Sequence, residues 1–177
     1  MILDLIDASS MLWRLSMRGV DVGERWQAVA DHWTPVASGG NYAFNDMHAM
    51  MAFVSAGRSD AISAVLHAQE AAAAHDTDNA GFIRDAGRAA TRAIKAFGDG
   101  DYAETIRLLR PIRSSAHRFG GSHAQRDVID LTLIEAALRG GDIRLAQALT
   151  AERAAAKGDS PFTQQLLKRS GLAMPAA

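Results

Sequence analysis

The sequence predicts an all-α fold built as an array of antiparallel helix hairpins, with about eight or nine helices. Alanine, leucine and arginine are abundant, and the 177 residues include only four prolines, a composition typical of helices. Apolar residues recur every three to four positions, as on the buried side of a helix. Short polar segments such as "SGGN", "GDGD" and "RGGD" separate these stretches, and connections this short place successive helices antiparallel.

The first two helices are predicted near the N-terminus. Residues 1–15 are apolar but carry Asp4 and Asp7 and lack a basic leader and a cleavage site, so they indicate an amphipathic helix rather than a signal peptide. A second buried stripe follows at helical spacing: Trp26, Val29, Ala30, Trp33 and Ala37. We expect Trp13, Trp26 and Trp33 to pack between these two helices.

The stretch "FNDMHAMMAF" predicts a central helix because it is apolar nearly all round. Its methionines, Met47, Met50 and Met51, are therefore expected in the core rather than on a peptide-binding surface. Asp46 and His48 are two residues apart, so they should point to different sides of the helix and form no local pair.

A repeat supports a single helical-repeat domain over 1–177. The segment "GDGDYAETIRLL" aligns with "LRGGDIRLAQAL", with Gly100 and Asp101 over Gly141 and Asp142, 41 residues apart. Such a period indicates tetratricopeptide-like pairs of helices. The diverged repeats are expected near 44–75, 80–119 and 122–157, followed by a C-terminal helix near 160–171. Pro111 should kink or end its helix.

Four stretches together resemble the C-terminal part of the tetratricopeptide repeat protein 38 family. They are "LIDASSMLWRLSMRGVDVGERW", "NYAFNDMHAMMAFVSAGR", "GGSHAQRDVIDLTLIEAAL" and "AERAAAKGDSP". The resemblance covers nearly the whole chain, which looks like a fragment or reduced form of that longer family. It implies a helical-repeat scaffold and supplies no reaction.

The most polar stretch, "GGSHAQRDV", raises the question of a site. If Ser122 caps a helix that runs to Arg139, then His123, Arg126, Asp127 and Asp130 share one face. That face also carries the apolar stripe, so the polar groups should be partly enclosed. Within this helix His123 can pair with Asp127, and Arg126 with Asp130. A partner on another helix is also expected, and the resemblance makes the Asp46 helix the nearest candidate. On the same helix Thr132, Glu135 and Arg139 should point to solvent.

Three interpretations of this polar stretch stay open. The first is a structural network that docks helices, with Gly120 and Gly121 allowing close approach. The second is a ligand pocket in the concave groove, closed by the Asp46 helix, where Arg126 holds a carboxylate or phosphate. The third, catalysis, lacks a motif, because adjacent Ser122 and His123 give no nucleophile and base geometry. The candidate binding residues are Asp46, His48, Ser122, His123, Gln125, Arg126 and Asp127.

The remaining expectations concern partners and location. The 19 basic residues balance 20 acidic ones, which disfavours nucleic acid and anionic lipid as partners. The absence of cysteine fits the cytoplasm. No motif points to a metal or a cofactor. The leading functional hypothesis is a scaffold for protein or peptide partners, with a homodimer through an uncovered N-terminal helix. The alternative is a small anionic ligand-binding protein, or an enzyme, around His123, Arg126 and Asp127.

Overall fold

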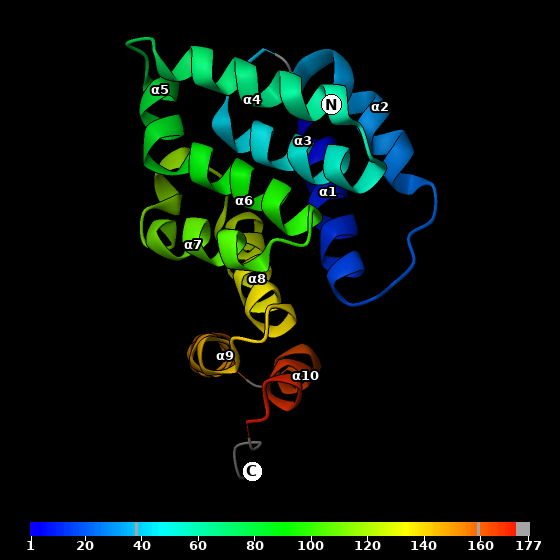
Figure 1. The fold of residues 1–177 in the computed structure, drawn as a ribbon, viewed down its shortest axis with the longest axis vertical. Coiled ribbons are helices and arrows are strands. Elements are labelled where there is room, and N and C mark those ends of the chain that lie inside the picture. The colour runs from blue at the N-terminus through cyan, green and yellow to red at the C-terminus, as the bar shows by residue number, and fades with distance from the viewer. Residues whose placement is uncertain (38, 159, 173–177) are drawn as a thin grey trace.

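The fold is all-α, as predicted (Figure 1). The computed structural model describes residues 1–37, 39–158 and 160–172. Within these ranges every regular element is a helix, and nine α-helices are present when the continuous helical run 78–98 is counted once. Its middle turn, η1, is a π-helix. The bounds are α1 Ile2–Met17, α2 Arg25–Ala37, α3 Ala43–Ala56, α4 Ser59–Ala73, α5 Asp78–Phe82, η1 Ile83–Gly87, α6 Arg88–Gly98, α7 Tyr102–Ile112, η2 Ala116–Phe119, α8 His123–Arg139, α9 Ile143–Lys157 and α10 Pro161–Ser170.

The helices pack mostly as sequential antiparallel pairs, and the two halves of the sequence repeat share one turn geometry. Gly100 and Gly141 adopt positive φ angles of 79° and 76°. Asp101 and Asp142 then cap α7 and α9, because each carboxylate accepts a hydrogen bond from the backbone N–H three residues ahead. The turn is therefore set by the same local chemistry in both places. Pro111 is followed by only one more residue of α7, so the helix ends there as expected.

Helix α3 lies at the centre of the N-terminal half. All its residues from 46 to 53 are buried, and Met47, Met50 and Met51 have no exposed surface. It packs against α1, α2, α4 and α6, and Figure 1 shows it among these helices. The prediction that this helix and its methionines belong to the core is confirmed.

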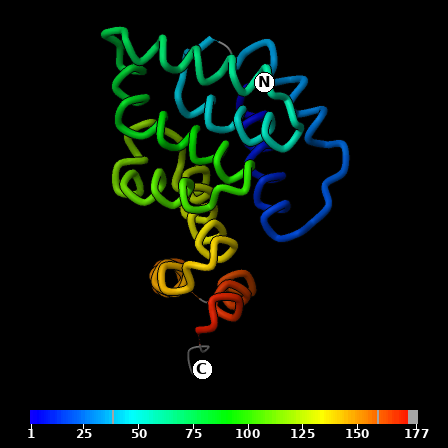
Figure 2. The backbone as a smooth tube through the Cα atoms, viewed as in Figure 1, coloured from blue at the N-terminus to red at the C-terminus, as the bar shows by residue number. Residues whose placement is uncertain are grey.

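The helices that begin successive antiparallel pairs, α1, α3, α6 and α8, also contact one another. Helix α1 contacts α3 and α8, and α6 also contacts both α3 and α8. Trp13 of α1 joins the group: its ring centroid is 5.3 Å from that of Phe97 in α6, and its Nε1 donates to Thr132 Oγ1 of α8 at 2.9 Å. Helix α1 thus packs against α3 and α8 and, through Trp13, against α6. Helices α9 and α10 lie at one end of the long axis (Figure 2).

The expectation of an uncovered first helix is wrong, because α2, α3 and α8 pack against α1. Trp13 and Trp26 stack edge to face at 6.5 Å, and Trp33 Nε1 donates to Ser9 Oγ at 2.9 Å. The tryptophans pack between the first two helices as predicted. A few apolar side chains of α1 stay exposed all the same: Ile2, Leu3 and Met11. Among the described helices, none has the length and hydrophobicity to cross a bilayer.

Candidate functional site

Asp46 and His48 are buried on different sides of α3, as their spacing predicts. Gln69 Nε2 of α4 donates to Asp46 Oδ2 at 3.0 Å and to Thr91 Oγ1 of α6 at 3.1 Å. Asp46 is only 3% exposed. Burial raises the pKa of its carboxyl to about 7, although the hydrogen bond from Gln69 acts in the opposite direction. This carboxyl connects three helices and faces no solvent.

His48 makes a second buried network. Its Nδ1 lies 2.8 Å from the Phe44 carbonyl oxygen and its Nε2 lies 3.0 Å from Ser10 Oγ. Because a carbonyl only accepts, Nδ1 carries the proton, and Nε2 accepts a hydrogen bond from the Ser10 hydroxyl. Burial lowers the pKa of His48 to about 4, against the effect of the Phe44 carbonyl. The ring is neutral at pH 7, fully buried, and ties α1 to α3.

The polar stretch "GGSHAQRDV" begins α8, as predicted. Ser122 Oγ accepts from Gln125 N at 3.2 Å, while Gln125 Oε1 accepts from Ser122 N at 2.9 Å. This reciprocal pair is a capping box. Gln125 Nε2 also lies 3.4 Å from Asp7 Oδ1 of α1. Ser122 and Gln125 therefore have a local structural role.

Two glycines bring the start of α8 against α3. Gly120 and Gly121 have φ angles of +97° and +76°, which favour glycine. A Cβ on Gly120 would meet the Tyr42 hydroxyl, and one on Gly121 would lie 2.5 Å from the Phe44 ring. The docking role proposed for these glycines agrees with this geometry.

The pairings predicted within α8 are wrong. Asp127 accepts bidentate hydrogen bonds from Arg153 of α9 at 2.7 and 3.0 Å, and Asp130 accepts from Arg113 Nε at 2.7 Å. Both carboxylates turn outward toward neighbouring segments, where a guanidinium offers better geometry than a side chain one turn away. Burial by itself would raise the pKa of Asp127, but Arg153 and the charges of Lys157 and Arg14 lower it overall.

Arg126 has different partners. Its guanidinium donates to the backbone oxygens of Gly120, at 3.1 Å, and of Gly121, and it lies 3.5 Å from His123 Nδ1. His123 itself is exposed. Neither residue meets the carboxylate expected for it.

The solvent-facing side predicted for α8 is also wrong in two of three positions. Thr132 is fully buried and Glu135 is 4% exposed. Arg169 of α10 donates to Glu135 at 2.8 and 2.9 Å, and Trp13 covers Thr132. The error arises because α8 is covered on more sides than one amphipathic stripe suggests. Arg139 does remain partly exposed, and its Nε donates to Glu135 at 2.7 Å.

A polar pocket of about 290 Å³ lies between the end of α7, the start of α8 and the end of α9. The sequence-predicted residues His123, Arg126 and Asp127 all line it. The Asp46 helix does not close it, and neither Asp46 nor His48 lines it, which corrects that expectation. The pocket adds residues that the sequence did not single out: Arg113, Ala116, His117, Ile129 and Lys157. They come from the end of α7, from η2, from α8 and from the end of α9, and only the packing of these elements brings them together.

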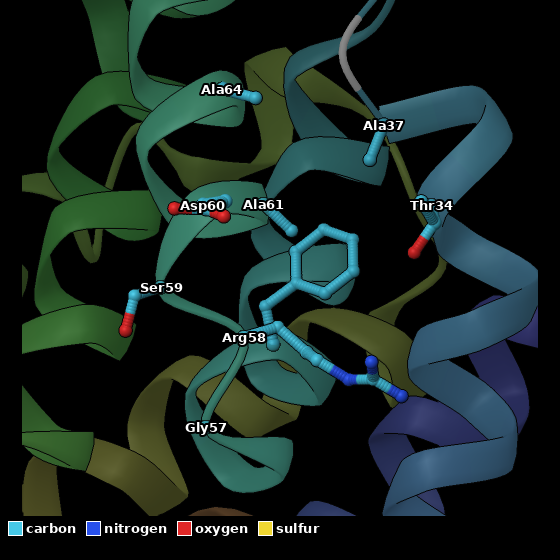
Figure 3. Close-up of a pocket in the computed structure, with 9 residues that line it drawn as sticks. Thr34, Ala37, Gly57, Arg58, Ser59, Asp60, Ala61 and Ala64 are labelled. Atoms are coloured by element: carbon cyan, nitrogen blue, oxygen red, sulfur yellow. The ribbon is translucent and has the colours of Figure 1, made fainter.

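A groove of about 620 Å³ lies between α2, α3 and α4. Figure 3 shows Thr34 and Ala37 of α2 facing Ala61 and Ala64 of α4. The buried Phe53 ring of α3 forms its floor. Arg58 lies at the rim, where it contacts Asp31 Oδ1 at 2.5 Å. The sequence analysis did not foresee this groove.

Comparison with known proteins assigns no family. No family model matches the chain, and no solved structure matches it significantly. Among the described residues, no group of three or more His, Asp or Glu side chains is placed to hold a metal ion.

Proposed function

We propose that this protein is a helical scaffold for protein–protein interaction, and that the groove between α2 and α4 receives its partner. The observation that carries the proposal is the groove itself, about 620 Å³ in volume, with an apolar aromatic floor and walls of alanine. Small wall residues leave space that the fold does not fill. An apolar side chain on a partner helix or peptide fits such a space, because anchoring residues bind in well-packed apolar pockets.

The rim of the groove adds polarity to this apolar centre. The ion pair of Arg58 and Asp31 is solvent-exposed, at 42% and 63% of the two side chains, so it contributes little to the stability of the fold. Asp60 of α4 also lines the groove. Charges around an apolar centre are the arrangement found in protein interfaces, where a polar rim sets orientation and specificity. The pairwise arrangement of helices is consistent with a repeat scaffold.

Site-specific photo-crosslinking tests this function. Asp60 at the exposed rim is replaced by the photoreactive residue p-benzoylphenylalanine, which leaves the alanine walls of the groove unchanged, and exposed His67 on the same helix serves as the matched position outside the groove. We expect a discrete protein adduct from position 60 that is absent from position 67. The additional substitution Ala61→Trp, which fills the groove, should abolish it. Equal adducts from both positions, or an adduct that survives Ala61→Trp, would contradict the proposal.

A second candidate is self-association through α1. Leu3 and Met11 are 62% and 59% exposed and stand about two turns apart on the helix. Apolar side chains at this spacing suit a helix from a second copy. The proposed homodimer would form through the exposed side of α1 that carries Leu3 and Met11, because α2, α3 and α8 cover the opposite side.

A further inference from the structure

The polar pocket between α7, α8 and α9 carries an inference independent of the groove. Its volume is about 290 Å³, close to the lower end of the range typical of small-molecule sites. Ala116 and Ile129 give it an apolar part, while arginine, lysine, histidine and aspartate side chains form the rest. Such a combination suits a small polar metabolite.

The two carboxylates of the pocket are already neutralised. Asp127 binds Arg153 through two oxygens and lies 3.7 Å from Lys157 Nζ. Asp130 binds Arg113, which also donates to Glu152 at 2.8 and 3.1 Å. These acids therefore offer little attraction to a cationic ligand, because cations of the protein occupy them.

Arg126 is the lining cation whose charge is not balanced. Its partners are the backbone oxygens of Gly120 and Gly121 and a ring nitrogen of His123. No carboxylate of the described residues lies within 4 Å of it, in contrast to Arg113 and Lys157. The carbonyl partners fix the guanidinium in place and leave its net charge intact. A fixed, half-buried cation in a cavity attracts an anion.

Two imidazoles extend this anion-binding character. His117 and His123 both line the pocket. His117 Nδ1 donates to the Ser114 carbonyl oxygen at 3.0 Å, and its Nε2 has no partner in the described part of the chain. His123 Nδ1 faces Arg126, so its Nε2 is the nitrogen left for a ligand.

We propose that this pocket binds a small metabolite through an oxyanion, either carboxylate or phosphate. Arg126 supplies the charge contact, and His123 donates a hydrogen bond from Nε2. His117 lines the wall, and because its Nδ1 proton is donated to Ser114, its Nε2 can donate to the ligand only from the imidazolium form. Ala116 and Ile129 contact the apolar part of the ligand. The volume of the pocket, about 290 Å³, suits a small molecule.

Proton NMR of the histidine rings tests the proposal on the intact chain. Inorganic phosphate and succinate are titrated separately, with sodium chloride at equal ionic strength as the blank. We expect the His117 and His123 resonances to shift saturably with at least one of the two anions. A stronger response to phosphate or to succinate identifies the preferred oxyanion.

Two substitutions assign the binding to Arg126. Arg126→Gln removes the charge and should weaken binding by about tenfold or more, the usual effect of losing a charged hydrogen bond. Arg126→Lys keeps the charge and should retain most of the affinity. Arg107→Gln, on an exposed arginine outside the pocket, is the matched control and should behave as wild type. Circular dichroism verifies that each variant is folded.

Three results would overturn the proposal. The first is no saturable shift of either histidine with phosphate or succinate. The second is an equal response to chloride, which would indicate ionic strength alone. The third is unchanged affinity in a folded Arg126→Gln variant.

Discussion

At the scale of single residues, the most unusual groups are two buried titratable side chains of α3 with opposite pKa shifts. Burial raises the pKa of Asp46 to about 7 and lowers that of His48 to about 4. Asp46 favours the folded state below its unfolded pKa, and this contribution is lost as the pH rises through 7. His48 contributes above its unfolded pKa, and its contribution is lost as the pH falls through 4. Between about pH 4 and 7 the free energy of unfolding therefore falls with pH because of Asp46 and rises with pH because of His48, so the two pH dependences offset each other.

The substitution Asp46→Asn separates the two effects. Asparagine keeps an oxygen that can accept from Gln69 and has no charge to bury. Wild-type protein loses the Asp46 contribution between pH 5 and pH 8, whereas the variant does not. We expect the free energy of unfolding of the variant, relative to wild type, to rise by about 2–3 kcal/mol from pH 5 to pH 8. Urea unfolding at both pH values measures this. Parallel stability changes in the two proteins would show that Asp46 is charged in the folded state at pH 5.

At the scale of elements, α8 shows what local sequence determines. Ser122, Gln125 and the helix end near Arg139 were predictable, because a capping box and helix termination involve residues within a few positions of one another. The partners of Asp127 and Asp130 were not, because Arg153 and Arg113 lie 26 and 17 residues away in sequence. Glu135 was predicted on the solvent-facing side for the same reason. Arg169 of α10 covers it, and the spacing of apolar residues in α8 contains no information about Arg169.

The contact between the loop before α8 and Phe44 at the start of α3 makes a specific prediction for Gly121. Gly121 and Gly141 share a φ of 76°, so alanine at either position carries the left-handed strain of about 1 kcal/mol. Only at Gly121 does the new Cβ lie 2.5 Å from the buried Phe44 ring, while nothing lies within 4 Å at Gly141. Gly121→Ala should destabilise the fold by a further 1–3 kcal/mol or so, measured by urea unfolding. Equal losses in the two variants would mean that Phe44 moves aside freely.

At the scale of the whole molecule, the sequence predicted helices in antiparallel pairs. It did not predict that helices of different pairs contact one another, such as α1 and α8. A repeat period and turn glycines define each pair, because both are local features. The contact of α1 with α8 joins residues more than 100 positions apart, as in the hydrogen bond from Trp13 to Thr132. It depends on the curvature that accumulates over several pairs. A cavity of about 220 Å³ remains beside this contact, and its lining includes Trp13 of α1, Phe97 of α6 and Arg139 of α8.

The self-association proposed above would use the outer side of α1, because α2, α3 and α8 cover the rest of this helix. Analytical ultracentrifugation of wild-type protein should show a concentration-dependent dimer. Met11→Asp should weaken it by about tenfold or more, because the new carboxylate is desolvated in the interface. Ile143→Asp is the matched control, since Ile143 is an exposed apolar side chain on α9, 46% accessible, and this variant should dimerise like wild type. A monomer at every concentration would remove the proposed dimer. An equal loss in both variants would place the contact away from α1.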